Sequence, residues 1–313
     1  MLDYLLRRLL ATIPVVLVVA VLVFLMLRLT PGDPAAVIAG DNATSEQIAT
    51  IRSRLGLDQP LLVQFGIWSG NLLQGNFGES FFFKKTVAEL ILGRIEPTLS
   101  LALATMVIAV GVAVPLGVLA AYKHGTWIDR VVMGFSVLGF SVPVFVIGYA
   151  LMYVFSITLN WLPIQGYQSL SGGFWGFLQR LILPAVTLSV IYIALIARMT
   201  RASVLEVLGE DYVRTARAKG QVERKILFRH ALKNAAVPIV TVVGLGVALL
   251  IGGVVVTESV FSIPGLGRLT VDAVLARDYP TIQAVILLFS VVYIAINLCV
   301  DVAYTVLDPR IRY

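Results

Sequence analysis

Six long apolar runs, separated by polar or basic stretches, dominate the pattern of this sequence. Each approaches the roughly 20 residues that a helix needs to cross ~30 Å of hydrocarbon. The runs are Leu9–Leu27, Leu99–Tyr122, Val131–Leu159, Arg180–Ala197, Ala235–Thr257 and Gln283–Leu307. They predict an all-α polytopic membrane protein with six transmembrane helices. The fourth run is the shortest, and without it the amino terminus and the basic segment 198–234 would lie on opposite sides of the membrane.

The first run also has features of a secretory signal, since Arg7 and Arg8 precede an apolar stretch. That stretch is longer than the apolar region of a signal peptide, and no small-residue cleavage pattern follows it. The next residues are the turn cluster Pro31-Gly32-Asp33-Pro34. We therefore expect residues 1–29 to hold the amino terminus and a retained first span.

Composition supports a membrane location and excludes several classes of protein. Hydrophobic residues make up 58% of the 313 residues and charged residues only 13%, against about 25% charged in soluble domains. This balance excludes a disordered chain, a coiled coil and a nucleic-acid reader, although the pI is near 9.5. A single cysteine, Cys299, excludes a disulfide scaffold. The expected surroundings are a lipid bilayer, and no nucleic-acid partner is expected.

The positive charge is concentrated on one predicted side of the membrane. With six spans, the segments on the side of the amino terminus are 1–8, 122–130, 198–234 and 308–313. They hold 15 of the 24 Lys and Arg residues, and segment 198–234 alone holds nine in 37 residues. Because cytoplasmic loops carry the excess of Lys and Arg, both termini are predicted to be cytoplasmic. The net charge of +6 is then a signal of topology.

Residues 30–98 form a long segment on the predicted outer side. Residues 99–313, which contain the other five spans, are the predicted core. Ser45 or Thr44 is placed to cap a helix, and Gly56 is its expected stop. Its apolar face repeats at i, i+3 and i+7, in Ile48, Ile51 and Leu55. A second short helix is expected from Phe65 to Leu73, with Trp68 as an interfacial anchor. The segment is either a docking platform for an external partner or a lid on the outer ends of the spans.

The basic segment 198–234 is patterned more strongly than topology requires. Apolar positions recur at i, i+4, i+8 and i+12 in Val204, Leu208, Tyr212 and Ala216, which predicts one amphipathic helix. Gly220 ends it, and Val222, Ile226 and Leu227, followed by His230, begin another. Two short helices would meet in a compact elbow, residues 211–233, that projects from the membrane. The cations either dock a protein partner or only enforce topology and touch anionic headgroups.

Motifs for catalysis and metal binding are absent from the sequence. It contains no G-x-x-x-x-G-K-[ST] phosphate loop, no C-x-x-C, no H-E-x-x-H and no G-x-S-x-G. We expect no catalytic residue and no metal site. Asn297 and Asp301 lie one helical turn apart within the sixth span, beside Tyr293 and Tyr304. Asp301 is interpreted as one half of an ion pair near the inner surface, or as the coupling-ion site of a secondary transporter.

Two features of the spans favour a bundle of closely packed helices. Gly244, Ala248 and Gly252 follow one another at four-residue spacing, which lets another helix approach closely. Pro143 lies near the middle of the third span, where it frees a carbonyl and permits a bend. Both features suit a bundle that rocks, and both are also ordinary packing devices.

The elbow and several other stretches together resemble one family. The elbow reads Asp211-Tyr212-Val213-Arg214-Thr215-Ala216-Arg217-Ala218-Lys219-Gly220. The other stretches are Leu5 to Leu10 with Pro31-Gly32-Asp33-Pro34, Leu55-Gly56-Leu57-Asp58-Gln59-Pro60, Gly75-Asn76-Phe77-Gly78-Glu79-Ser80, Glu258-Ser259-Val260-Phe261-Ser262-Ile263-Pro264-Gly265-Leu266-Gly267, Arg277-Asp278-Tyr279-Pro280 and Leu307-Asp308-Pro309-Arg310. They are similar to permeases of ABC importers, in the dipeptide, oligopeptide, nickel and glutathione branch. The long outer segment resembles the first permease of the pair.

This resemblance implies a multi-pass protein of a bacterial inner membrane that forms half of a transport path. The implied partners are a related second permease, two ATP-binding subunits and an extracytoplasmic substrate-binding protein. ATP and Mg would be bound by the partner subunits, and this chain would bind no cofactor. Residues 30–98 and 258–282 would face the binding protein, and the elbow would be an EAA-type coupling loop.

The resemblance also implies roles for individual residues. Ala216 and Gly220, being small, would let the elbow sit in a groove of an ATPase subunit. Charged contacts would come from Arg214, Arg217 and Lys219. Arg214-Thr215-Ala216 stands where the family has E-A-A, so no contact of the family's glutamate carries over. Gly244, Ala248 and Gly252, with Pro143, would serve packing and the path.

The substrate and two rival functions stay open at this level. Peptides, glutathione, opines and nickel chelates are all candidates within the family. A secondary transporter that uses Asp301 is the first alternative, although no repeat of broken helices supports it. A membrane scaffold or receptor without transport is the second.

Overall fold

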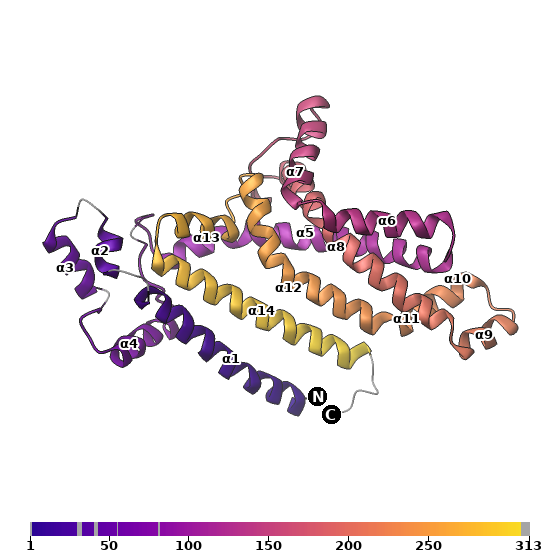
Figure 1. Ribbon diagram of the computed structural model, residues 1–313, viewed down its shortest axis with the longest axis horizontal. Helices are drawn as coiled ribbons and strands as arrows, with labels where there is room; N and C mark the ends of the chain where they lie inside the picture. Colours follow the sequence, from indigo (N-terminus) through magenta and orange to yellow (C-terminus); the bar gives the residue numbers. More distant parts are fainter. Residues whose placement is uncertain (1, 30–32, 41–42, 55, 81, 308–313) are drawn as a thin grey trace. The chain divides into compact units, whose positions relative to one another are not determined.

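A computed structural model describes residues 2–29, 33–40, 43–54, 56–80 and 82–307 (Figure 1). Within these residues the regular structure is helical, and an isolated bridge joins Glu79 to Thr86. This confirms the all-α class. Three features expected from the sequence lie outside the described residues: Pro31 and Gly32 of the turn cluster, Leu55 of the apolar face, and the tail 308–313.

Five helices of the described chain are long and apolar enough to cross a membrane. They are α1 (Leu2–Arg28), α5 (Val87–Tyr122), α8 (Phe174–Leu208), α12 (Ala236–Val260) and α14 (Tyr279–Leu307). A sixth span is formed if the pair α6 (Trp127–Ser141) and α7 (Val144–Met152), continued by the π-helical turn η1 (Tyr153–Thr158), is counted as one. Each apolar run of the sequence thus corresponds to one span.

The third span is not the continuous helix that its apolar run predicts. The helix axis bends by 102° at residues 142 and 143. Pro143 has no N–H to donate, and Val142 before it is extended, with φ −92° and ψ 123°. The apolar run continues across this break, but Pro143, noted in the sequence as permitting a bend, lies at it.

Several spans are longer than their apolar runs, α5 and α8 most of all. α5 begins at Val87 instead of Leu99, and α8 extends from Phe174 to Leu208 instead of from Arg180 to Ala197. Charged residues end an apolar run but do not end a helix, which continues outside the hydrocarbon. Two further helices, α2 (Pro34–Ala39) and α13 (Leu266–Leu275), were not predicted.

The short helices predicted in segment 30–98 are confirmed. α3 spans Ser45–Arg54, and a reciprocal pair caps it: the Gln47 N–H donates to Thr44 Oγ1 at 3.3 Å, and the Thr44 N–H donates to Gln47 Oε1 at 2.9 Å. α4 spans Leu61–Leu73, beginning earlier than predicted. Arg52 of α3 donates to Asp33 at 2.6 Å, and this contact lowers the pKa of the Asp33 carboxyl from its ordinary value.

The described chain forms two compact units. The first consists of Pro97–Gly267 and the described part of Ala295–Tyr313, and the second of Leu2–Glu96 and Arg268–Ile294. These units group residues by contact, so the predicted division into 1–29, 30–98 and 99–313, which concerns sides of the membrane, stays a prediction.

α8 is the central helix of the first unit. It packs against α6, α7 and α12 (Figure 1), and 67% of its most apolar stretch is buried. The apolar core includes Leu188, Tyr192 and Ile196 of this helix. Large apolar side chains of α5, α6 and α7 are exposed on the opposite faces, as expected of helices that meet lipid or another subunit.

A buried carboxylate organises the turn after α12. Glu258 is fully buried and accepts a hydrogen bond from Thr98 Oγ1 at 2.6 Å, while Thr98 Oγ1 accepts one from the Leu266 N–H at 2.8 Å. A Cβ on Gly265 would overlap the Glu258 carboxylate, and one on Gly267 would lie 2.6 Å from the Val255 Cα. The glycines of the stretch 258–267 are therefore required by close packing.

The second unit joins distant stretches of the chain. Phe24 of α1 packs against Phe65 and Trp68 of α4, with ring centroids 5.1 and 5.5 Å apart. Ser80 and Thr281 both donate to Oδ2 of Asp278, which is 3% exposed. The stretches 75–80 and 277–280, noted separately in the sequence, thus meet at one buried acid.

Replacing Gly267 with alanine should destabilise the chain, because the new Cβ meets backbone that cannot move freely. We expect a loss of about 1–3 kcal/mol, measured as a lower thermal unfolding midpoint in detergent. Gly252→Ala is the matched control, since nothing lies within 4 Å of a Cβ there. Equal unfolding midpoints for the two variants would contradict the packing described for Gly267.

Candidate functional site

The basic elbow is built from short helices that follow α8. They are α9 (Asp211–Ala218), α10 (Glu223–Lys225), the π-helical turn η3 (Ile226–Ala231) and α11 (Leu232–Asn234) (Figure 1). The predicted single amphipathic helix from Val204 to Ala216 is wrong. Val204 and Leu208 belong to α8, and the chain breaks at Gly209 and the extended Glu210 before α9 begins. The apolar period continues across this break, so periodicity alone does not locate it.

Gly220 forms the turn that closes α9, as predicted. Its φ of +72° is a left-handed conformation that favours glycine. The Gly220 N–H donates to Arg217 O at 2.9 Å, and the Gln221 N–H donates to Ala216 O at 3.2 Å. This pair of bonds is a Schellman motif, which satisfies the last carbonyls of the helix. The position is open, because no neighbouring atom lies within 4 Å of a Cβ built there.

The elbow has a small apolar core of its own. Val213 and Ile226 are fully buried and Ala216 is 7% exposed, and all three pack together with Val207 and Leu208 of α8 partly covering them. The structure thus places Ala216 inside the elbow. Its small size lets α9 lie close to η3.

Polar contacts hold the turn and the helices together. Arg217 Nε donates to Glu223 Oε1 at 2.8 Å across the Gly220 turn. His230 Nε2 lies 3.0 Å from Gln221 Oε1, and Asn234 Nδ2 donates to the Tyr212 hydroxyl at 2.9 Å. These contacts link α9 to η3 and α11, so the short helices of the elbow are held together as one structural unit.

The cations predicted for partner contacts do not share one environment. Arg217 is held by Glu223. Arg214 is 74% exposed and meets Asp211 only at 3.5 Å, and Lys219 is exposed. Thr215 is also exposed, and its hydroxyl donates to the Asp211 carbonyl at 3.0 Å.

The elbow also exposes two large apolar side chains. Val222 is 72% exposed and Phe228 is 59% exposed. The sequence places Val222 on an apolar helical face with Ile226 and Leu227, but only those two are buried. Phe228 was not predicted from the sequence as a contact residue. Its position between the apolar pair Ile226 and Leu227 and the charged Arg229 could have indicated an exposed aromatic side chain.

A buried ion pair joins α8 to α6 upstream of the elbow. Arg201 Nε and Nη2 donate to the two oxygens of Asp129 at 2.5 and 2.8 Å, a bidentate arrangement. Asp129 is 4% exposed and also accepts from the Gly125 N–H at 3.0 Å, while His124 Nδ1 lies 3.2 Å from it. The sequence interpretation counted these residues only as charges of a cytoplasmic segment.

The predicted packing stripe on α12 packs only in part within the chain. A Cβ on Gly244 would overlap Val300 of α14, and Ala248 is 9% exposed. Gly252 is exposed, with open space beside it. Gly253 lies against Leu188 and Tyr192 of α8 instead.

The elbow thus exposes positive charge, at Arg214 and Lys219, and apolar side chains, at Val222 and Phe228, so it offers a contact surface. Within the described residues, no group of three or more His, Cys, Asp or Glu side chains is placed to hold a metal ion. Asp301 on α14 is 9% exposed and engaged in an interaction within the chain.

Two protein-family models match this chain and together cover almost all of it. One is described as a binding-protein-dependent transport system inner membrane component and matches residues 113–313. The other describes the amino-terminal part of such membrane components and matches residues 1–102.

Several curated proteins are similar over their whole length. A probable peptide ABC transporter permease of Sinorhizobium fredii is 57% identical over 310 residues, 99% of each chain. A glutathione transport system permease of Salmonella choleraesuis is 49% identical over 313 residues, 100% of each. A putative peptide transport system permease of Brucella abortus is 47% identical over 308 residues, 98% of each.

A solved structure shares the fold. It is a chain of the inward-facing MetNI methionine ABC transporter, with a TM-score of 0.58 and 18% identity, and the match covers 70% of this chain and 96% of that one. At this identity the likeness concerns the fold alone.

Replacing Asp129 with asparagine should destabilise the chain, because the Arg201 guanidinium would lose its charged acceptor. We expect a loss of about 1.5–3 kcal/mol, measured as a lower thermal unfolding midpoint. Asp211→Asn is the matched control, since that side chain is 96% exposed, and it should change stability by no more than about 0.5 kcal/mol. Unchanged stability in Asp129→Asn would show that the pair is dispensable.

Proposed function

This chain belongs to the family of binding-protein-dependent transport system inner membrane components, and from that premise we propose that it forms half of the solute path of an ATP-driven importer of peptides. It is a multi-pass inner-membrane protein of importer-type fold. The partners are a related second permease, two ATP-binding subunits and an extracytoplasmic binding protein. ATP and Mg are bound by those ATP-binding subunits, and this chain supplies no catalytic residue.

The observation that carries the proposal is the elbow, whose short helices are linked by hydrogen bonds and which exposes the apolar side chains of Val222 and Phe228. Docking surfaces take much of their binding energy from a few apolar anchors surrounded by polar contacts. Val222 and Phe228 supply such anchors, and Arg214 and Lys219 supply charge around them. Gly220 leaves the turn open for close approach. An ATP-binding subunit is the partner that this surface serves.

Movement of the elbow reaches the membrane through α8. The elbow core packs on Val207 and Leu208, at the end of that helix. Farther along α8 from the elbow, Arg201 forms its bidentate ion pair with Asp129 of α6. We assign to this pair the role of a clamp, so that α6 follows α8 when ATP binding draws the elbows together. The bend at Pro143 then lets α7 respond separately from α6.

The second permease covers an apolar face of α12. Leu245, Leu249 and Val256 are 40–54% exposed and lie on the same side as the open Gly252. Their spacing of three or four residues makes a continuous stripe along the helix. Close approach of a partner helix is proposed at Gly252 alone, since Gly244 packs against Val300 and Ala248 is buried within this chain.

Peptides are the proposed substrate class. Two of the similar permeases named above are described as peptide permeases, and another serves glutathione, which is itself a tripeptide. Residues 30–98 and 258–282 are proposed to face the binding protein that delivers the substrate.

The transport function is tested by reconstituting the chain with its second permease, ATP-binding subunits and binding protein in vesicles. Uptake of a labelled peptide should require ATP. Asp301→Asn should retain ATP-linked uptake, because the ATP-binding subunits supply the energy. Uptake without ATP that fails in Asp301→Asn would favour a secondary transporter, and no uptake under any condition would favour a scaffold.

Phe228→Asp should weaken the hold on the ATP-binding subunits, because it places a charge in the apolar contact. We expect at least a roughly tenfold loss of co-purified ATP-binding subunit and of uptake, as for an interface hot spot, with the unfolding midpoint unchanged. Gly220→Trp should also lose the subunits, since the open turn would be filled, but its unfolding midpoint should fall because the left-handed φ of +72° favours glycine. Phe82→Asp is the control for co-purification of the ATP-binding subunit, because Phe82 is similarly exposed at 61% but belongs to the second unit. Full retention of the subunits in both elbow variants would exclude the elbow as the docking surface.

A further inference from the structure

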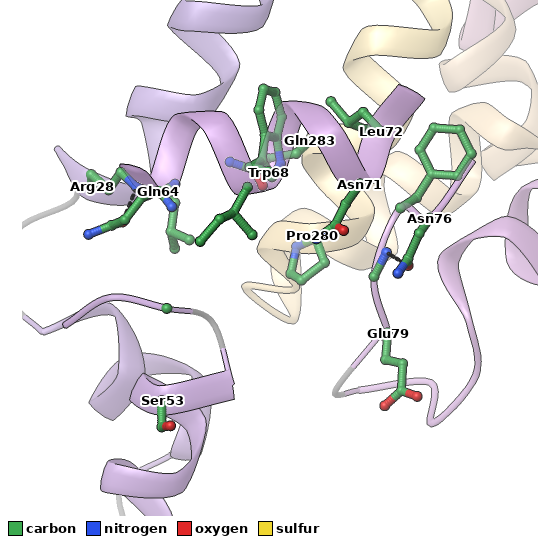
Figure 2. A pocket seen from close by; sticks show the side chains of 15 residues that line it. Arg28, Ser53, Gln64, Trp68, Asn71, Leu72, Asn76, Glu79, Pro280 and Gln283 are labelled. Atoms are coloured by element: carbon green, nitrogen blue, oxygen red, sulfur yellow. Dashed lines mark hydrogen bonds between the residues drawn. The ribbon is translucent and has the colours of Figure 1, made fainter. Parts of the chain in front are cut away.

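The second unit contains a cavity of about 730 Å³ (Figure 2). Its wall is formed by the ends of α1 and α14, by α3 and α4, and by residues 76–79. The volume falls within the range of sites that bind drug-sized ligands, about 300–1,000 Å³. The charge pattern of the sequence predicts that this part of the chain lies on the outer side of the membrane.

Arg28 lines the cavity as a cation without a counter-ion. Its Nε donates to Gln64 Oε1 at 2.8 Å, its Nη1 donates to the Phe24 carbonyl at 3.0 Å, and its guanidinium lies 3.6 Å from the Phe24 ring centroid. None of the ion pairs formed by the described residues includes Arg28. A partly buried cation loses hydration, so an anionic ligand group would be stabilising here.

Two carboxamides of the cavity wall are buried and held in place. Gln64 is 7% exposed, and its Nε2 donates to the Gln59 carbonyl at 2.7 Å. Gln283 is 5% exposed, and its Nε2 donates to the Val23 carbonyl at 2.8 Å. These contacts fix the wall around the guanidinium, so little side-chain entropy would be lost when a ligand binds.

The rest of the wall suits an amide-bearing ligand. Asn71 and Asn76 add two more carboxamides, which both donate and accept hydrogen bonds as peptide groups do. Trp68 and its apolar neighbours provide contact surface. Figure 2 shows Arg28 at the left and Glu79 at the lower right, so the Glu79 carboxylate lies apart from Arg28 and can meet a positive group.

We propose that this cavity binds a short peptide, with the peptide's carboxylate on Arg28 and its amino end toward Glu79. A lipid phosphate would satisfy Arg28 alone, but it would leave the carboxamides and Glu79 without a role. The site rests on the proposed function of a peptide importer and adds a contact made by the permease itself.

The test measures equilibrium binding of labelled trialanine to the reconstituted transporter without its binding protein. We expect trialanine to bind at least about tenfold more tightly than trialanine amide, because the amide lacks the carboxylate. R28Q should weaken trialanine binding by a similar factor and remove the preference for the free acid. E79Q should weaken trialanine binding and leave N-acetyl-trialanine unaffected.

R94Q is the matched control, because Arg94 also faces an aromatic ring, Phe83 at 5.5 Å, but does not line the cavity. Its affinity should equal that of the unmodified chain. Equal binding of trialanine and its amide by the unmodified transporter, or unchanged affinity in R28Q, would overturn the proposal. Displacement of a bound lipid by inorganic phosphate but not by trialanine would also overturn it. Failure of ATP-linked uptake is a separate result, which bears on the proposed function and not on this binding measurement.

Discussion

Hydrocarbon offers no hydrogen-bond partner to a peptide group, so each part of this chain that crosses the membrane must satisfy its backbone within a helix. That constraint requires helix throughout the apolar runs, as in α5 and α8, each of which is helical over the whole of its run. It also makes the break at Pro143 informative. The bend of 102° lies where a proline has already removed a donor. The described spans are therefore long continuous helices, except for the span that bends between α6 and α7. Such helices are able to carry movement from a projecting elbow into the bundle.

The buried polar groups connect these helices to one another. Asp129 joins α6 to Arg201 of α8, and Glu258 joins the turn after α12 to Thr98 of α5. In the second unit Asp278 accepts hydrogen bonds from the hydroxyls of Ser80 and Thr281. Each acid is at most 4% exposed and accepts a hydrogen bond from an arginine, threonine or serine side chain. Arg28 differs, because it borders a cavity and has no acidic partner among the described residues, and the proposed ligand carboxylate would supply one.

The elbow shows both the reach and the limit of sequence reasoning. Its location, the stop at Gly220 and the second helix after Val222 were predicted and are present. The break at Gly209 was missed, because apolar residues keep the same period on both sides of it. Ala216 was assigned to a partner contact, and the structure places it in the elbow's own core. Val222 was placed on the apolar helical face, yet it is exposed.

The sequence by itself determined the class of protein, the number of apolar runs and the family, because hydropathy and local motifs are properties of contiguous residues. Tertiary structure alone decided which polar residues meet. Asp129 and Arg201 are 72 positions apart, and Ser80 and Asp278 are 198 apart. It also decided which glycines are required by packing, and that Arg28 and Gln283 line one cavity. Such contacts depend on how helices pack, and a periodic pattern gives the apolar face of a helix without naming the residue that will oppose it.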